Sequence, residues 1–289
     1  MPAVIIMSCV AVLLAVAGVA AVIARSPAGT PIVYGTSVAA CVVAGAVALA
    51  HLLTDSTAAP AVILPLGLPW LGAHFRLDAL AAFFLVVVDL GGAAASLYAL
   101  GYGRHEAAPL RVLPFYPAFL AGMNLVVLAD DAFSFLLSWE FMSLASWALV
   151  MAHHRVQDNA RAGYIYLVMA SAGTLTLLLA FGLLSGAGGG YDFAAMRAGE
   201  HGPVLAALVL TLVVLGAGSK AGLVPLHVWL PLAHPAAPSH VSALMSGVMT
   251  KVAVYGFIRV VFDLLGPPAW SWSMAVLALG GVTAALGVL

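Results

Sequence analysis

Three ionisable side chains lie inside long apolar stretches of this sequence. Glu140 lies in FLLSWEFMSLASW, Lys220 in LVVLGAGSKAGLVP and Lys251 in SGVMTKVAVYGF, and the chain contains only these two lysines. A charged side chain at the centre of a bilayer costs about 2.5–3.5 kcal/mol on insertion scales, so such residues usually face a protein interior and act there. Movement of protons or ions is the chemistry that these three residues predict.

A buried carboxyl group and a buried amine respond to each other in a way that suits a relay. An unpaired buried carboxyl group favours its neutral form, and a nearby lysine restores its charge. Burial also favours the neutral form of a lysine, so Lys220 and Lys251 can release a proton, which an arginine does not do. Two alternatives stay open: Glu140 is a permanently neutral, hydrogen-bonded residue, or Lys220 extends to the membrane surface.

Four further residues are weaker candidates for the same pathway. Asp89 in VVVDLGG is a charge at membrane depth that either takes part in transport or only bonds neighbouring helices. His240 is the favoured histidine because it precedes the helix that carries Lys251, and the alternative is a loop histidine in water. His227 and His234 belong to the same segment, PLHVWLPLAHPAAPSH.

The sequence gives no support for a metal, a cofactor or a nucleic-acid partner. The histidines match no zinc template such as HExxH, and Cys9 and Cys41 form no CxxC pair. The run GAGSKAG at 216–222 lacks the GK[ST] ending of a P-loop, and no haem, flavin or iron–sulfur ligand set is visible. The net charge is −1, without a basic patch. We therefore expect no metal and no cofactor in this chain, and no catalysis by the chain alone.

Membrane-spanning helices must position these residues. Hydrophobic residues make up 64% of the 289 positions and charged residues only 7%, against about a quarter charged in soluble domains. At about 20 residues per crossing, the sequence predicts an all-α, polytopic transmembrane helical bundle with nine candidate spans. These are 3–24, 31–53, 78–100, 112–129, 131–152, 162–185, 203–224, 238–262 and 270–289.

The seventh candidate span is expected to break near Lys220. Gly216, Gly218 and Gly222 precede Pro225, and three more prolines follow by residue 238. A proline removes a backbone donor and clashes with the preceding turn, so the helix should stop and resume as the short piece LHVWL at 226–230. Broken membrane helices expose backbone groups and tend to line ion pathways.

Charges in the loops predict an orientation and some local structure. Five arginines follow the first, third and fifth spans and two follow the second and sixth, which places the N-terminus outside under the positive-inside rule. Arg259, at the far end of the eighth span, runs against this pattern unless it snorkels. Asp130 and Asp131 are expected to form a solvated helix start. We expect a multi-pass protein of the cell's inner (plasma) membrane.

Two long segments carry a family resemblance. They are LSWEFMSLASWALV, around Glu140, and SKAGLVPLHVWLPLAHPAAPSHVSALMSGVMTK, which ends at Lys251. With them the chain resembles the antiporter-like subunits shared by respiratory complex I, Mrp-type cation/proton antiporters and membrane-bound hydrogenases, and it most resembles the hydrogenase-4 and formate hydrogenlyase type. The resemblance is strongest over about 130–262.

The resemblance implies an arrangement and a set of roles. Residues 112–262 would form the first of two inverted five-helix repeats, after N-terminal helices at 1–111, and 263–289 would begin a second repeat that is incomplete in a truncated chain. Glu140 would pair with Lys220, and Lys251 would pass protons onward, with His240 at a less secure position. The partners would be other membrane subunits of a redox complex and, through them, its hydrogenase or quinone-reducing arm, together with the lipid bilayer.

Three functions are compatible with these residues. The first is a proton-translocating subunit of a redox-driven complex that uses the Glu/Lys/Lys relay. The second is a sodium/proton antiporter subunit of the Mrp kind, which would use the same residues with a different coupled ion. The third is a non-transporting membrane scaffold of a hydrogenase or quinone oxidoreductase complex, in which the charges serve helix packing.

Overall fold

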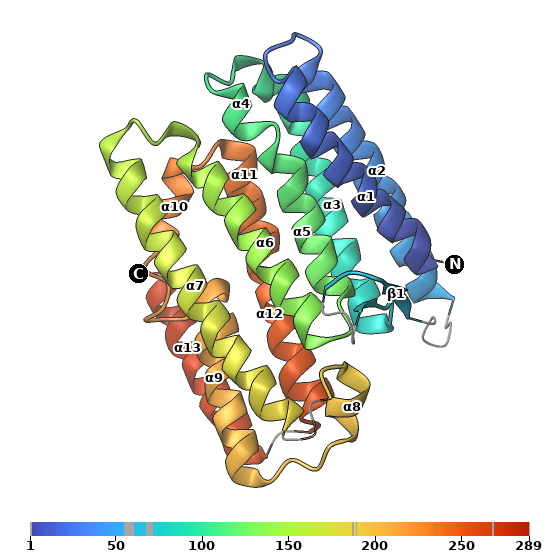
Figure 1. The fold of residues 1–289 in the computed structure, drawn as a ribbon. Coiled ribbons are helices and arrows are strands. Elements are labelled where there is room, and N and C mark those ends of the chain that lie inside the picture. The colour runs from blue at the N-terminus through green and yellow to red at the C-terminus, as the bar shows by residue number, and fades with distance from the viewer. Residues whose placement is uncertain are drawn as a thin grey trace.

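The computed structural model describes residues 2–54, 61–67, 72–186, 188, 190–267 and 269–288. In Figure 1 the long helices run side by side as one bundle, with short helices at its ends. Within the described ranges, nine helical stretches are long and apolar enough to cross a membrane. The predicted all-α transmembrane bundle is therefore confirmed, and its spans begin and end within a few residues of those expected.

Within the described ranges, eight long helices and one composite span make up the bundle. The long helices are α1 (Pro2–Ile23), α2 (Gly29–Leu53), α3 (Ala79–Tyr102), α5 (Phe115–Leu128), α6 (Ala132–Val150), α7 (Gln157–Ser185), α9 (Pro203–Ala221) and α13 (Trp270–Val288). The eighth span is continuous over α11 (Ser239–Leu244), the π-helical segment η3 (Met245–Met249), α12 (Thr250–Ile258) and the π-helical segment η4 (Arg259–Leu264). π-helical turns inside α-helices are often found at functional sites.

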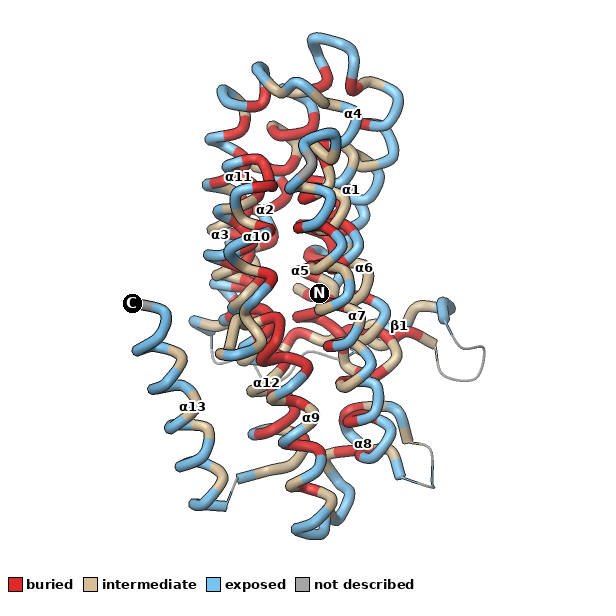
Figure 2. Tube along the Cα trace, turned by 90° about the vertical axis from the view of Figure 1, so that its left-hand side faces the viewer, coloured by how far each residue is buried: buried red, intermediate tan, exposed pale blue. Residues whose placement is uncertain are grey.

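Short elements connect these spans, most of them at the two ends of the bundle. The short helices are α4 (Pro109–Val112), α8 (Phe193–Ala198) and α10 (Leu230–Ala236), together with the 3-10 turns η1 (Gly103–His105) and η2 (Met151–His153). Strands β1 (Val62–Leu64) and β2 (Ala73–Phe75) form an antiparallel hairpin in which Ile63 faces His74. In Figure 2 buried residues concentrate in the interior of the bundle, whereas α13 is exposed along most of its length.

Small residues bring neighbouring helices into close contact. A Cβ atom on Gly92 of α3 would lie 2.8 Å from the Cys41 sulfur of α2. A Cβ atom on Gly216 of α9 would lie 2.8 Å from the carbonyl oxygen of Gly173 in α7. Backbones can approach this closely only where both surfaces lack bulky side chains. The second contact matters most for function, because it fixes the last turns of α9 against α7.

The seventh span breaks after Lys220, but the chain does not resume where the sequence suggested. Helix α9 ends at Ala221 and is followed by the cap residue Gly222, which has the left-handed φ of 89° that favours glycine. Residues 224–229 form turns, and the predicted helical piece at 226–230 is absent. Helix α10 begins only at Leu230, because Pro231 fits the first turn of a helix, where its missing N–H is not needed. The Trp229 indole donates to the Ser219 carbonyl at 2.8 Å and folds the turns back onto α9.

A network of ion pairs closes the end of the bundle that carries the hairpin. Arg259 pairs with Asp78 and with Asp263, each at 2.7 Å, and Arg197 pairs with Asp263 at 2.7 Å. Arg259 is only 4% exposed. Arg259 therefore does not snorkel, because two carboxylates compensate its charge inside the protein. Burial alone would raise the pKa of Asp78, yet Arg259 holds that pKa below its ordinary value.

The start of α6 also differs from its prediction. Asp131 caps the helix by accepting from the Ser134 N–H at 2.7 Å, as expected for a helix start. However, Asp131 is fully buried and also accepts from the His74 N–H of β2 at 2.8 Å. Asp130 is partly buried and pairs with Arg76 at 2.8 Å. The two aspartates are not solvated, because the hairpin covers this turn.

Candidate functional site

Lys220 lies in a buried pocket between α6, α7 and α9. Its side chain is in the last turn of α9, and the residue is 4% exposed. The Nζ atom donates to the Ser143 hydroxyl of α6 at 2.7 Å and lies 5.4 Å from the Trp139 ring and 5.7 Å from the Tyr166 ring. Aromatic faces attract a cation at such distances. Lys220 therefore does not extend to the membrane surface.

Glu140 belongs to the same face of α6 as Ser143. The two residues are three positions apart, which makes them neighbours on a helix surface. Glu140 is partly buried, and its Oε2 accepts from the Thr174 hydroxyl of α7 at 2.7 Å. Among the described residues no nitrogen of Lys220 lies within 4.0 Å of a Glu140 oxygen. Each charge thus bonds to a hydroxyl, and the direct pairing implied by the resemblance is not formed in this structure.

A small void adjoins the Lys220 side chain. It measures about 10 Å³ and is lined by residues of α7 and α9 together with Trp229. A volume of roughly 10–15 Å³ is the least that holds a water molecule. Gly173, Gly216 and Lys220 are among the residues that line this void. The pocket can therefore accommodate about one small polar ligand such as water.

A second set of hydroxyls leads from this pocket towards the eighth span. The Ser146 and Tyr166 hydroxyls lie 2.6 Å apart, and the Tyr166 hydroxyl donates to the Met249 sulfur at 3.7 Å. Met249 is the last residue of η3 and lies two positions before Lys251. Ser146, Tyr166 and Thr174 were missed in the sequence. The spacing of Ser143 and Ser146 by three residues in an apolar helix was the available signal.

Lys251 is exposed, contrary to the expectation that it is buried. Its Nζ atom donates to the Ser246 carbonyl at 3.0 Å and to the Thr250 hydroxyl at 3.3 Å. Ser246 belongs to the π-helical segment η3, where the regular α-helical bonding pattern is interrupted. Within the described part of the chain, no hydrogen bond joins Lys251 to Lys220 or to Ser143. The structure therefore brings Glu140 and Lys220 to one site and leaves Lys251 on the surface of the bundle.

Within the described part of the chain, none of the three histidine candidates forms a hydrogen bond with the Lys220 amine. His240 is 1% exposed and bonds through Nε2 to the Tyr34 hydroxyl at 2.9 Å, so the alternative of a loop histidine in water is wrong. His234 bonds to the Ser242 hydroxyl at 3.0 Å and stacks on Trp229. Burial lowers the pKa of His234, although a bond to Ser242 opposes this. His227 is partly buried.

Residues 129–289 match a family model described as NADH:quinone oxidoreductase/Mrp antiporter, transmembrane. The matched range contains Glu140, Ser143 and Lys220 and extends over more than half of the chain. The chain belongs to this family. The resemblance seen in the motifs around Glu140 and Lys220 is therefore confirmed, and with it the assignment as a multi-pass membrane subunit of the antiporter-like type.

Individual relatives come from more than one branch of the family. Hydrogenase-4 component B of Escherichia coli is 43% identical over 219 residues, which are 74% of this chain and 32% of that protein. A probable K(+)/H(+) antiporter subunit of Rhizobium meliloti is 32% identical over 259 residues, which are 84% of this chain and 25% of that protein. The chain thus spans between a quarter and a third of the length of these two relatives.

The fold is shared with a solved transport complex. The structure of the Mrp complex from Dietzia sp. DQ12-45-1b matches 98% of this chain and 30% of its own, with a TM-score of 0.79 and 24% identity. At this identity the match concerns the fold. The family members named here are components or subunits of larger assemblies, which accords with the expectation of membrane subunits as partners.

Asp89 lies in the middle of α3, a helix that contributes no residue to the lining of the Lys220 pocket. It is 1% exposed and accepts from the Asn124 amide of α5 at 3.2 Å.

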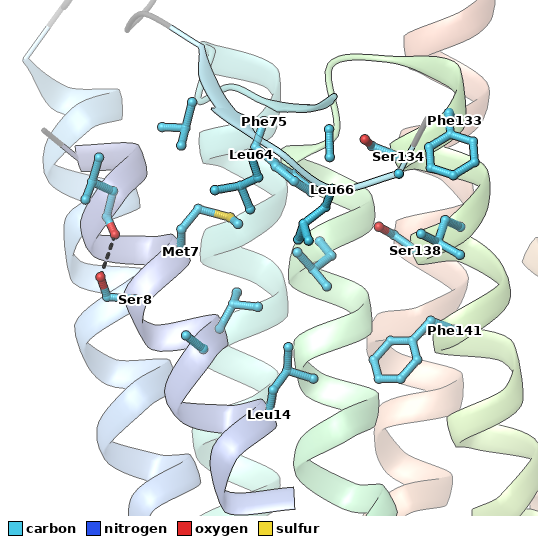
Figure 3. Close-up of a pocket in the computed structure, with 18 residues that line it drawn as sticks. Met7, Ser8, Leu14, Leu64, Leu66, Phe75, Phe133, Ser134, Ser138 and Phe141 are labelled. Atoms are coloured by element: carbon cyan, nitrogen blue, oxygen red, sulfur yellow. Dashed lines mark hydrogen bonds between the residues drawn. The ribbon is translucent and has the colours of Figure 1, made fainter. Parts of the chain in front are cut away.

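An apolar cavity of about 650 Å³ lies between α1, the hairpin and α6. Figure 3 shows Phe133, Phe141 and Leu14 around it, with Ser134 and Ser138 as its polar side chains on α6. This cavity does not extend the polar Lys220 pocket. Within the described ranges no cluster of three potential metal ligands is found.

Proposed function

We propose that this chain is a proton-translocating, antiporter-like subunit of a redox-driven complex in the plasma membrane, and that Lys220 holds the moving proton. One observation carries the proposal. The buried Lys220 amine bonds to the neutral Ser143 hydroxyl, while the Glu140 carboxylate bonds to the Thr174 hydroxyl. An amine without a bonded counter-ion can release its proton. The Glu140 carboxylate, which lies on the same face of α6 as Ser143, would hold the proton on the amine if it moved closer to Lys220.

The free energies involved are sufficient for such a switch. Two opposite charges 4 Å apart interact by about 4 kcal/mol at an effective dielectric constant of 20. This corresponds to about a thousandfold change in the affinity of the amine for a proton. Movement of Glu140 between Thr174 and Lys220 therefore controls whether Lys220 keeps its proton. The bonds of Lys220 to Ser143 and of Glu140 to Thr174 are those that we expect in the separated state, in which release is favoured.

The released proton needs an acceptor, and we assign this role to Lys251. Ser143, Ser146 and Tyr166 supply hydroxyls on the side of the pocket that faces η3. Hydroxyls both donate and accept hydrogen bonds and can pass a proton together with water. Lys251, just beyond η3, then receives it at the surface of the bundle. His240 bonds to Tyr34 and takes no part in this step.

The test uses the complete complex in sealed vesicles. Lys220→Ala and Glu140→Gln should each abolish proton pumping while redox turnover and assembly continue. The matched control is Thr211→Ala, because Thr211 is exposed on the same helix as Lys220 and bonds only to its own turn. Intact pumping in Lys220→Ala would falsify the proposal. Lost pumping with normal assembly in Lys251→Ala would count against a non-transporting scaffold.

A second candidate function is cation/proton antiport. It is favoured by the 32% identity to a probable K(+)/H(+) antiporter subunit. The same residues would act, with a potassium or sodium ion exchanged for the proton. The two functions differ in vesicles that lack a redox substrate, where only an antiporter produces pH changes on addition of the cation. Such changes, lost in Lys220→Ala, would replace the redox-driven function by antiport.

A further inference from the structure

A column of buried polar side chains lies between α2, α3 and α5, apart from the Lys220 pocket. Each of these three helices contributes two polar residues separated by seven or eight positions. Such a spacing is two helical turns, so the two residues of each helix share one face. The pairs are Tyr34 and Cys41 on α2, Asp89 and Ser96 on α3, and Tyr116 and Asn124 on α5.

The inner layer of the column surrounds Asp89. Its Oδ1 accepts from the Asn124 amide at 3.2 Å, and the Cys41 thiol interacts with the same carboxyl group. The other Asp89 oxygen and the Asn124 carbonyl oxygen are buried without a hydrogen-bond partner in the described part of the chain. Buried polar atoms are nearly always satisfied in native proteins. These two atoms therefore mark places where a proton or a water molecule completes the bonding.

The outer layer of the column contains hydroxyls and one imidazole. The Ser96 and Tyr116 hydroxyls lie 2.8 Å apart, and Tyr34 bonds to His240 at 2.9 Å. The rings of Tyr34, Tyr116 and His240 touch one another, with centroids 4.9 to 5.3 Å apart. The His240 Nδ1 atom is also buried without a partner among the described residues. Every group in this layer can both give and take a proton.

The outer layer leads to the polar end of the bundle. The Glu106 carboxylate, just after α3 and η1, interacts electrostatically with Tyr34 and His240. Glu106 in turn bonds to His153 at 2.8 Å, and His153 is about one third exposed. Titratable groups thus continue from the surface to His240. The inner layer lies two helical turns deeper, about 10 Å at 1.5 Å per residue.

Among the residues that the structure describes, the groups that face Asp89 include no cation. They are Cys41 from α2, Cys9 from α1 and Asn124 from α5, while η3 places Val248 against the neighbouring Gly91. An isolated carboxylate is costly in an apolar interior, and it takes up a proton unless a cation compensates it. A carboxyl group in this setting changes its proton occupancy whenever protons reach it.

We propose that Asp89 is a second proton-binding site of this subunit, filled from the His240 end of the bundle through Tyr34, Tyr116 and Ser96 with bridging water. The bound proton resides on the Asp89 carboxyl group, which is then a neutral acid bonded to Asn124. The site is independent of Glu140 and Lys220, because the described contacts of its members lie among α1, α2, α3, α5 and α11.

Infrared spectroscopy of the intact complex in lipid nanodiscs tests this proposal. At about pH 7 the chain should show a carboxylic acid C=O band that is lost in Asp89→Asn and kept in Glu140→Gln. The Cys41 S–H band, assigned with Cys41→Ser against Cys9→Ala, should shift when that acid ionises. Should Asp89→Asn not assemble, Asn124→Ser assigns the band by shifting it. Absence of the acid band, or a band that stays unchanged from about pH 5 to about pH 9, overturns the proton-binding site.

The route is tested by exchange of the acid proton for deuterium. Tyr34→Phe and Ser96→Ala each remove one hydroxyl of the outer layer, so exchange at Asp89 should slow by at least about tenfold in each. Glu140→Gln and Lys220→Ala should leave this rate unchanged, which separates the Asp89 site from the proposed pumping site. Wild-type exchange rates in both hydroxyl variants would overturn the route from His240.

Discussion

Lys220 donates to the Ser143 hydroxyl of α6 at 2.7 Å. Glu140 lies only one helical turn from Ser143 on the same face of that helix, yet the Lys220 amine bonds to the hydroxyl. The carboxylate is held by Thr174, also at 2.7 Å. Two neutral hydroxyls therefore keep two opposite charges apart inside an apolar bundle. Because each hydroxyl bonds to a charged group, small changes at either one should alter how the proton is held.

Ser143→Ala should weaken the hold of Lys220 on its proton. Hydrogen bonds to charged groups contribute roughly 1.5–3 kcal/mol, so the affinity of the amine for a proton should fall about 10- to 150-fold. Proton pumping in vesicles should decline accordingly. Ser143→Thr keeps the hydroxyl and should retain most of the activity. If Ser143→Ala pumps like the wild type, the bond seen here has no part in transport.

Thr174→Val should release Glu140 towards Lys220. Valine has nearly the shape of threonine but offers no hydroxyl, so the carboxylate loses a bond worth roughly 1.5–3 kcal/mol. A closer ion pair holds the proton on Lys220, and pumping should slow by about tenfold or more. Thr174→Ser, which keeps the hydroxyl, is the decisive control and should pump like the wild type. Wild-type pumping in Thr174→Val would contradict the proposed release of Glu140.

Gly216→Ala should disturb the contact that fixes Lys220 against α7. The added Cβ atom would lie 2.6 Å from the Thr176 hydroxyl and 2.8 Å from the Gly173 carbonyl oxygen. Overpacking of this kind should lower the free energy of unfolding by about 1–3 kcal/mol. Gly182→Ala on α7 is the control, since nothing lies within 4 Å of its Cβ position. Equal melting temperatures for the two variants would contradict the close approach of α7 and α9.

The ion-pair network gives the protein a pH-dependent stability with a defined sign. Arg259 holds the pKa of Asp78 below its ordinary value despite burial. The stabilisation is therefore complete above the unfolded pKa of about 3.9 and is lost as the pH falls through the lower folded value. Asp78→Asn should flatten the acid limb of a plot of melting temperature against pH.

Asp130 should show the opposite trend in the same measurement. Burial raises its pKa, and Arg76 opposes this only in part. The folded state thus binds this proton more tightly than the unfolded state, so its contribution to stability declines as the pH rises through the folded pKa. Asp130→Asn should remove that decline. The same slope in both variants would show that the two carboxyl groups are not distinguished by their arginine partners.

Much of the fold and part of the site could be predicted from the sequence. Apolar runs of membrane length fixed the spans, because every backbone group in a bilayer must be bonded within a helix. Glu140 and Lys220 stood out because charges at that depth are rare. The glycines and prolines from Gly216 to Pro225 indicated the helix break, although not the place where the next helix begins.

The tertiary structure alone decided which of these charges meet. Lys220 and Lys251 look alike in sequence, yet one is enclosed by α6 and α7 and the other is exposed, because hydropathy measures depth in the membrane and not the direction in which a helix face points. The pairing of Arg259 with Asp78 joins residues 181 positions apart, which no local pattern reveals. The chain's composition thus determined that it spans a membrane and carries charges there, and the packing of its helices determined which hydroxyls, rings and counter-charges surround each of them.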